Sequence, residues 1–258
     1  MNSITPIRAR VLTVALLMSF LMNTKRMLLV VVAGYLVMAP AVAQPTRIEA
    51  APAQISGDAL PDVDGLRAML LAGQYDVLDQ RLNAYQTSYE KNVDGERALV
   101  IAFAALHVPD PDLDPHFVQW TKAHPGSYAA NLSYGIFNFA MALAWRGEKG
   151  SRDTHPEKLA NMRSYLAKAE QSLERSLPLT GKPLVTYTLL IQISRYVDAA
   201  SRAGYWLDQA IESDPRCVEP RRAFMTTLLP SWGGSYEQMQ KFAAETKNNF
   251  PQIGRAHV

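Results

Sequence analysis

Three histidines and three aspartates lie close together in the sequence, at His107, Asp110, Asp112, Asp114, His116 and His124. Imidazole nitrogens and carboxylate oxygens are common metal ligands. Their spacing differs from the two-histidine helix pattern of zinc enzymes, and a calcium loop would need glycine and glutamate where Pro115 and Thr121 stand. We therefore expect no metal, and interpret the aspartates and prolines as helix caps in a solvated connector.

The run Trp232-Gly233-Gly234-Ser235 could expose backbone amides to an anion, because it contains two adjacent glycines. No lysine follows at the distance found in a phosphate-binding loop. The simpler interpretation is a tight turn between helices. In that turn Ser235 is the N-cap of the last helix, and Gln238 completes a capping box.

The tripeptide Trp145-Arg146-Gly147 ends a long apolar segment. Gly147 can adopt the left-handed conformation that ends a helix, and Arg146 can interact with the carbonyl end of that helix. We interpret the tripeptide as a cap with Trp145 in the core, and a ligand site is the alternative. The candidate binding residues are therefore Trp145, Arg146, Gly147, Trp232, Gly233, Gly234 and Ser235.

Covalent catalysis has no clear signature, since the sequence lacks a Gly-x-Ser-x-Gly motif, a cysteine–histidine signature and a paired-carboxylate motif. We expect no catalytic residues and no cofactor. Catalytic groups can nevertheless assemble from distant residues, so an envelope enzyme with a site near Trp145, Arg146 and Trp232 is the alternative function. Cys217 is the single cysteine, and we expect a buried structural thiol.

The charge distribution argues against nucleic-acid binding. The chain has 26 Lys and Arg residues against 24 Asp and Glu residues, but residues 1–43 hold four of the basic residues and none of the acidic ones. The remainder is mildly acidic and lacks the clustered basic surface of nucleic-acid-binding domains. We therefore expect no nucleic-acid partner.

The N-terminal 43 residues resemble a secretory signal peptide. Residues 27–43 are apolar, follow Lys25-Arg26 and end in the small-x-small sequence Ala41-Val42-Ala43. They fall short of the roughly 20 apolar residues of a comfortable membrane span. We predict cleavage after Ala43, with Met22 as an alternative start, and a periplasmic or secreted protein. The alternative is that residues 27–43 stay uncleaved and anchor the protein in the inner membrane, its only expected membrane contact.

Two further segments are expected to lie outside the folded domain. Residues 44–61 contain three prolines and several small or polar residues, which favours an extended linker. The last six residues, 253–258, match the in-frame reading of a common sequencing adapter. We expect this tail to be non-native.

Residues 62–252 show the apolar spacing of amphipathic helices in nearly every window. The clearest stripe is formed by Leu159, Met162, Leu166, Ala169, Leu173 and Leu177. No stretch alternates with the period of a strand, so we predict an all-α domain. The predicted helices cover residues 63–72, 75–91, 94–106, 114–123, 128–146, 159–177, 184–198, 199–213, 218–229 and 235–249.

An internal repeat is visible at an offset of 34 residues, which equals the tetratricopeptide period. This offset aligns Ala169 with Ala203 and Leu173 with Leu207. Residues 184–217 fit the tetratricopeptide consensus at six of eight positions: Tyr187, Leu190, Ala203, Leu207, Ala210 and Pro215. We predict a tetratricopeptide-like superhelix of stacked antiparallel helix pairs, with a degenerate repeat before residue 184 and a weak half-repeat at residues 236–249.

Three motifs together resemble a bacterial family known as domain of unknown function 4034 (DUF4034). They are Phe117-Val-Gln-Trp120 with Ala123-His-Pro-Gly-Ser127, then Ala142-Leu-Ala-Trp145-Arg-Gly147, then Leu229-Pro-Ser-Trp232-Gly-Gly-Ser-Tyr-Glu237. The resemblance covers about residues 66–252. It implies a tetratricopeptide-like all-α fold and no assigned activity.

The expected function is that of an interaction scaffold. Stacked helix pairs create extended surfaces that bind proteins or peptides. Such a surface is the only feature of the sequence that indicates a function. We therefore expect an unidentified protein or peptide partner.

Overall fold

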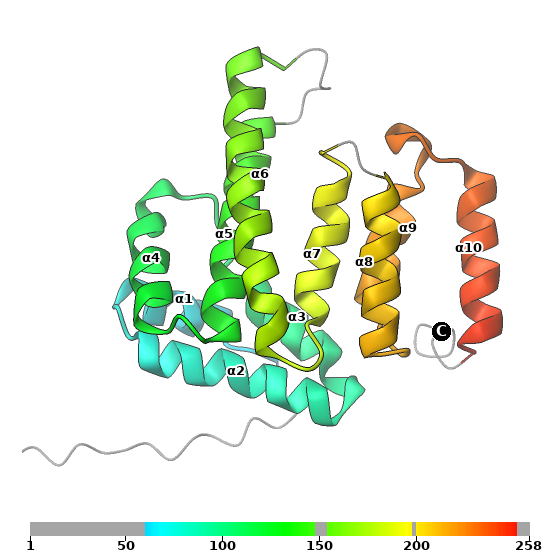
Figure 1. Cartoon of the computed structure of the whole chain (residues 1–258). Coiled ribbons are helices and arrows are strands. Elements are labelled where there is room, and N and C mark those ends of the chain that lie inside the picture. The colour runs from blue at the N-terminus through cyan, green and yellow to red at the C-terminus, as the bar shows by residue number, and fades with distance from the viewer. Residues whose placement is uncertain (1–59, 148–153, 198–199, 252–258) are drawn as a thin grey trace, which may run out of the picture. The chain divides into compact units, whose positions relative to one another are not determined.

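Helices make up most of the chain that the computed structural model describes, namely residues 60–147, 154–197 and 200–251. Within these ranges the chain forms ten α-helices and no strand, which confirms the all-α prediction (Figure 1). The helices are α1 (Val63–Leu71), α2 (Tyr75–Lys91), α3 (Glu96–Ala104), α4 (Asp114–Ala123), α5 (Tyr128–Arg146), α6 (Pro156–Ser176), α7 (Leu184–Ser194), α8 (Ala200–Ser213), α9 (Glu219–Thr227) and α10 (Tyr236–Asn249). The predicted signal peptide, the 253–258 tail and nearly all of the linker lie outside the described residues.

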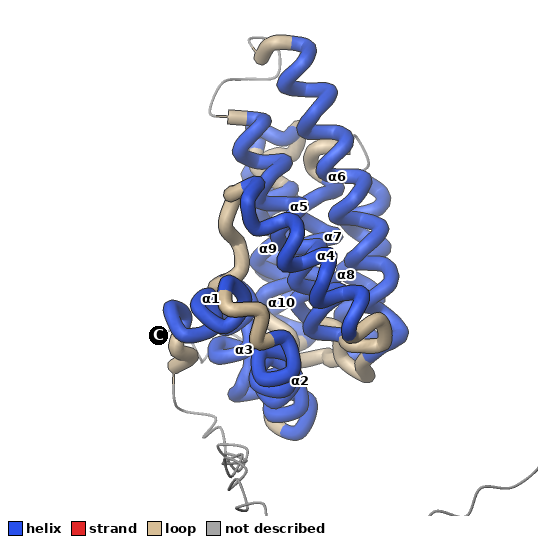
Figure 2. Tube along the Cα trace, turned by 90° about the vertical axis from the view of Figure 1, so that its left-hand side faces the viewer, coloured by secondary structure: helices blue, strands red, loops and turns tan. Residues whose placement is uncertain are grey.

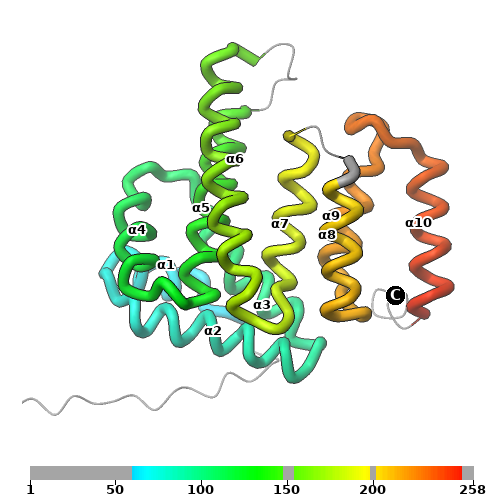
Figure 3. The backbone as a smooth tube through the Cα atoms, in the orientation of Figure 1, coloured from blue at the N-terminus to red at the C-terminus, as the bar shows by residue number. Residues whose placement is uncertain are grey.

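The central helices form antiparallel pairs, α5 with α6 and α7 with α8, and α9 packs beside α7 (Figures 1 and 3). The α5–α6 pair is especially close at Gly135, where an added Cβ would lie 2.7 Å from Leu173 Cδ2. The stripe predicted on α6 faces this contact, since Met162, Leu166 and Leu173 are all buried. The helical-repeat architecture predicted from the sequence is therefore confirmed.

Helices α7 and α8 are the unit that best fits the tetratricopeptide consensus. Ala203 and Ala210 are buried where α8 approaches its neighbours, and Leu190 is buried on α7. Small residues at such positions allow helix axes to approach closely. The Tyr187 ring lies beside the Trp206 ring, with 6.2 Å between centroids. These consensus side chains therefore contribute to the packing of the α7–α8 pair.

The predicted half-repeat, α10, is only loosely attached. Described residues of this helix include none that is buried. Its aromatic contact with the rest of the stack is Phe242 on Phe224, with 5.0 Å between ring centroids.

The helices lie in layers (Figure 2). In Figure 1, α6 and α8 form a front layer, α5 and α9 form a second layer behind it, and α7 packs against both α8 and α9. Helices α1 and α3 cover only the lower part of the second layer's outer side, and α2 crosses beneath the lower ends of the stack. The upper part of the second layer therefore remains uncovered by α1–α3.

Polar side chains of α2 form hydrogen bonds at the start of α5. Asp79 Oδ1 accepts hydrogen bonds from Ser127 Oγ at 2.5 Å and from Trp120 Nε1 at 3.1 Å. Asn83 Oδ1 accepts a hydrogen bond from the Ala129 amide at 3.3 Å. Because helix N-termini have amides without an intrahelical partner, Asn83 stabilises the start of α5 directly, and Asp79 holds the side chain of its N-cap, Ser127.

One to two turns farther along α2, the same arrangement repeats at the loop before α7. Gln86 Nε2 donates to the Lys182 carbonyl at 3.0 Å. Glu90 Oε1 accepts hydrogen bonds from the Gly181 amide at 3.1 Å and from the Thr180 hydroxyl.

A third contact reaches the start of α9. The Tyr89 hydroxyl donates to Asp214 Oδ2 at 3.1 Å, and Lys182 Nζ lies 3.3 Å from the same oxygen. Burial alone would raise the pKa of Asp214, but the Arg216 amide and the Lys182 ammonium outweigh it and lower the pKa. Helix α2 thus contacts the starts of α5, α7 and α9 or the loops that precede them.

Glu96, at the start of α3, also contacts the start of α9. Its carboxylate accepts hydrogen bonds from the Val218 amide at 3.0 Å and from the Glu219 amide at 2.6 Å, at the N-terminus of α9. The residue is 8% exposed. Negative charge at a helix N-terminus is favourable because of the helix dipole.

Cys217 lies in the same buried region, as predicted for a structural thiol. Burial raises the pKa of its thiol to about 12. Arg221 is also buried, and its Nη2 donates to the Pro215 carbonyl at 2.9 Å. Among the described helices none is both long and apolar enough to span a membrane.

Candidate functional site

The Trp232–Ser235 turn is built by its glycines. Gly233 has a φ of +88°, which favours glycine, and a Cβ on Gly234 would lie 2.1 Å from the Leu228 carbonyl oxygen. Ser235 Oγ accepts a hydrogen bond from the Gln238 amide at 3.1 Å and caps α10. The predicted turn and N-cap are therefore confirmed, and the turn itself explains both glycines.

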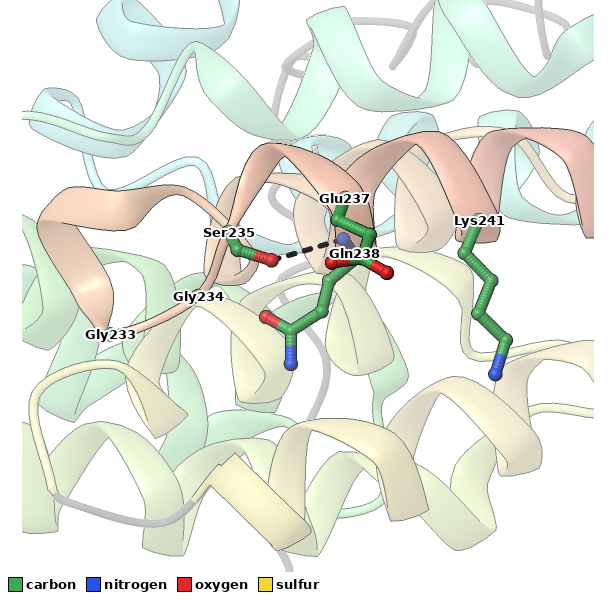
Figure 4. Close-up of a pocket in the computed structure, with 6 residues that line it drawn as sticks. All are labelled: Gly233, Gly234, Ser235, Glu237, Gln238 and Lys241. Atoms are coloured by element: carbon green, nitrogen blue, oxygen red, sulfur yellow. Dashed lines mark hydrogen bonds between the residues drawn. The ribbon is translucent and has the colours of Figure 1, made fainter.

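An open depression of about 410 Å³ lies at this turn (Figure 4). Every residue that lines it comes from one continuous segment: Gly233, Gly234, Ser235, Glu237, Gln238 and Lys241. Glu237 already places a carboxylate in the first turn of α10, where a bound anion would otherwise find the positive end of the dipole. The depression is a by-product of the turn and gives no support to anion binding.

The end of α5 differs from the prediction in two respects. Gly147 has φ +61° and ψ −167°, so its positive φ is confirmed but its conformation is not the left-handed helical one. Trp145 is 36% exposed, so its assignment to the core is wrong. The physical reason is that α5 and α6 extend above α4 and α7, which leaves the last turn of α5 without those neighbours (Figure 1). Arg146 Nη1 donates to Thr154 Oγ1 at 3.2 Å.

Four rings, from α5 and from the segments that follow α3, α7 and α9, form a continuous aromatic row. Neighbouring ring centroids lie 6.1, 6.3 and 5.3 Å apart, and each pair meets edge to face. In order, the aromatic row consists of His107, Phe139, Tyr196 and Trp232. Phe139 is buried, whereas Trp232 is 38% exposed. His107 is exposed as well, so the row crosses the core at Phe139 and reaches the surface at both ends.

Arg195 lies at the Trp232 end of the aromatic row. Its guanidinium carbon is 5.2 Å from the Trp232 ring centroid and 5.6 Å from the Tyr196 centroid. Arg195 Nε donates to the Gln192 carbonyl at 3.3 Å, and Nη1 donates to Thr226 Oγ1 at 3.3 Å. A half-buried guanidinium thus lies beside both rings and is held there by hydrogen bonds to α7 and α9.

The two predicted motifs end up at the same end of the stack, since α5 and α9 both finish at its upper end in Figure 1. Trp232 belongs to the aromatic row, whereas Trp145 does not. Sequence reasoning missed Arg195, Tyr196 and Phe139. The available signal was that Arg195-Tyr196 follows the apolar run of α7 directly, which puts a charged and an aromatic side chain at the helix end.

The three histidines of the predicted connector make contacts with different residues. His116 Nδ1 contacts the Tyr75 hydroxyl at 3.2 Å, His124 Nε2 lies 3.0 Å from Asp76 Oδ1, and His107 begins the aromatic row. In the part of the chain that is described, no three His, Cys, Asp or Glu residues are placed to hold a metal ion.

Comparison with known proteins identifies a family but no activity. The sequence profile described as "Domain of unknown function (DUF4034)" matches residues 62–201, more than half of the chain. Trp145–Gly147 lies within the matched segment and Trp232–Ser235 beyond it. No curated protein and no solved structure is significantly similar. The resemblance noted in the sequence is thereby confirmed, and the chain belongs to the DUF4034 family.

Proposed function

We propose that this protein is an exported interaction scaffold that binds a protein or peptide partner through the aromatic row. The observation that carries the proposal is the exposed end of the row, where Trp232, Tyr196 and Arg195 gather at the upper ends of α7 and α9. Tryptophan, tyrosine and arginine dominate the residues that contribute most to protein–protein affinity.

The position of the row supports this function. Helices α1 and α3 cover the lower part of the second layer, whereas Tyr196 and Trp232 follow the upper ends of α7 and α9. Helical-repeat proteins commonly bind partners along one face of the stack. Phe139 is buried in the core and contacts Tyr196, which in turn contacts Trp232. The exposed Trp232 ring therefore packs against a rigid support.

Export is proposed from the sequence of residues 27–43. It is tested by expressing the full gene in a Gram-negative host, fractionating the cells and sequencing the N-terminus. We expect a periplasmic or secreted protein that begins at Gln44. A membrane-bound protein that retains residues 27–43 would contradict cleavage.

Photo-crosslinking tests the scaffold proposal. The crosslinking amino acid p-benzoylphenylalanine would replace Trp232 in the native host, and Tyr205 in a matched control. Tyr205 is 55% exposed and belongs to α8, in the other layer, so it reports on non-specific contact.

We expect a discrete adduct at position 232 and none at 205. With the identified partner purified, Trp232→Ala should weaken binding at least tenfold, which corresponds to about 1.4 kcal/mol, and Tyr205→Ala should leave it unchanged. Equal adducts at both positions, or no effect of Trp232→Ala, would refute the scaffold proposal and favour substrate screening for the enzyme alternative.

A further inference from the structure

Unlike Arg202 and Arg222, Arg195 has no acidic partner in the described part of the chain. Arg202 pairs with Glu170 at 2.9 Å, and Arg222 pairs with Glu219 at 2.6 Å. No carboxylate among residues 60–147, 154–197 and 200–251 lies within ion-pair distance of Arg195. Within those ranges, no acidic side chain therefore balances this half-buried positive charge.

The hydrogen-bonding capacity of Arg195 is also largely unused. A guanidinium has five N–H donors, and the contacts to Gln192 and Thr226 use two of them. The donors lie in the guanidinium plane, whereas the Trp232 and Tyr196 rings contact the cation through their faces. The edge of the guanidinium remains suited to the two parallel hydrogen bonds that a carboxylate accepts.

The cation adjoins one end of the aromatic row. From Tyr196 the aromatic row continues to Phe139 and His107, in steps of 6.1–6.3 Å between centroids. A ligand that satisfies both the guanidinium and the rings must carry a carboxylate and an apolar group close together. The last residue of a polypeptide has both on the same Cα atom, whereas an acidic side chain has no apolar group of its own.

We propose that Arg195, Trp232 and Tyr196 bind the C-terminal carboxylate of a partner polypeptide that ends in an apolar or aromatic residue. This inference rests on the proposed scaffold function and specifies the chemistry of its partner. Arg195 supplies paired donors to the carboxylate, Thr226 and Gln192 hold the guanidinium in place, and the rings contact the last side chain.

Three dipeptide probes test the proposal on the purified full chain. They are N-acetyl-Leu-Phe as the free acid, the same peptide as its C-terminal amide, and N-acetyl-Leu-Glu-amide, whose only carboxylate is on a side chain. Binding is followed by fluorine NMR of 5-fluorotryptophan-labelled protein, in which the Trp232 resonance is assigned with Trp232→Phe. We expect saturable shifts of this resonance with the free acid, and affinity at least tenfold lower for the other two probes.

Arg195→Gln removes the cation, and Arg202→Gln is the matched control on α8. We expect the preference for acid over amide to vanish in Arg195→Gln, to weaken in Arg195→Lys and to persist in Arg202→Gln. Thermal unfolding verifies that each variant is folded. If Arg195→Gln does not fold, Arg195→Lys provides the test instead.

Equal affinity for acid and amide, or a preference that survives in Arg195→Gln, would overturn the proposal. Equal binding of the glutamate probe would overturn the assignment to a polypeptide C-terminus. These failures are distinct from failure of the scaffold function, because a partner crosslinked at position 232 could bind without a free carboxylate.

Discussion

Removing the carboxylate of Glu96 tests whether its hydrogen bonds to the N-terminus of α9 stabilise the stack. In Glu96→Ala the amides of Val218 and Glu219 lose an acceptor that lies 2.6–3.0 Å away. A hydrogen bond to a charged group contributes about 1.5–3 kcal/mol, and relief from burying a charge offsets part of the loss of two such bonds. We therefore expect the free energy of unfolding to fall by about 2–4 kcal/mol, a large part of the stability of a typical domain.

The assay is urea denaturation followed by circular dichroism, with Glu157→Ala as control. Glu157 is an exposed acid in the first turn of α6, so its loss should change stability by less than about 0.5 kcal/mol. Glu96→Gln retains an acceptor oxygen and should cost about 1 kcal/mol or less. Equal stabilities of Glu96→Ala and Glu157→Ala would show that solvent replaces the carboxylate and would refute this stabilising role.

The pH dependence of this comparison has a defined sign. Burial, opposed by the Glu219 and Val218 amides, raises the pKa of Glu96 above its usual value of 4.5. The folded state then binds this proton more tightly than the unfolded state, so its contribution is full at low pH and is lost as pH rises through the folded-state pKa. The destabilisation by Glu96→Gln should accordingly be larger at about pH 4 than at about pH 7.

Three further outcomes are expected. The lowered pKa of Asp214 contributes stability above the ordinary aspartate pKa of 3.8 that is lost as pH falls, so Asp214→Asn should be less acid-sensitive than wild type in urea titrations. Gly234→Ala should destabilise by about 1–3 kcal/mol, because its Cβ would clash with the Leu228 carbonyl, whereas Gly126→Ala, which has no atom within 4 Å, should be neutral in the same assay. Cys217 should resist a thiol reagent in the native protein and react once urea unfolds it; rapid labelling of the native protein would contradict its burial.

The positions of the helices could be predicted well from the sequence. Helices α2 and α5 have the predicted bounds, because Gly73 and Ser127 precede them as breaker and cap and because apolar spacing defines their length. The α7–α8 unit was predictable for a different reason: its alanines and leucines repeat the pattern of α6 at a fixed offset.

The crosswise placement of α2 could not be predicted in the same way. Apolar periodicity shows that a helix buries one face, but it does not show which helix covers that face. Glu96 illustrates the difficulty, since its acceptor role depends on amides 122 and 123 residues away. The prediction that Trp145 lies in the core is wrong for a related reason, because the exposure of its side chain depends on how far α5 extends beyond its neighbours.

The two ends of the stack serve different purposes. At the lower end, Glu96, Asp214 and Asp79 are buried or partly buried acids whose oxygens are committed to donors from other helices. At the upper end, Arg195 retains free donors and Trp232 retains exposed surface. Residues that only stabilise the fold gain from satisfied contacts, whereas the free donors of a cation beside these rings form further hydrogen bonds only when a ligand binds. Variants at the lower end should therefore change stability more than affinity, and variants of Arg195 or Trp232 should change affinity more than stability.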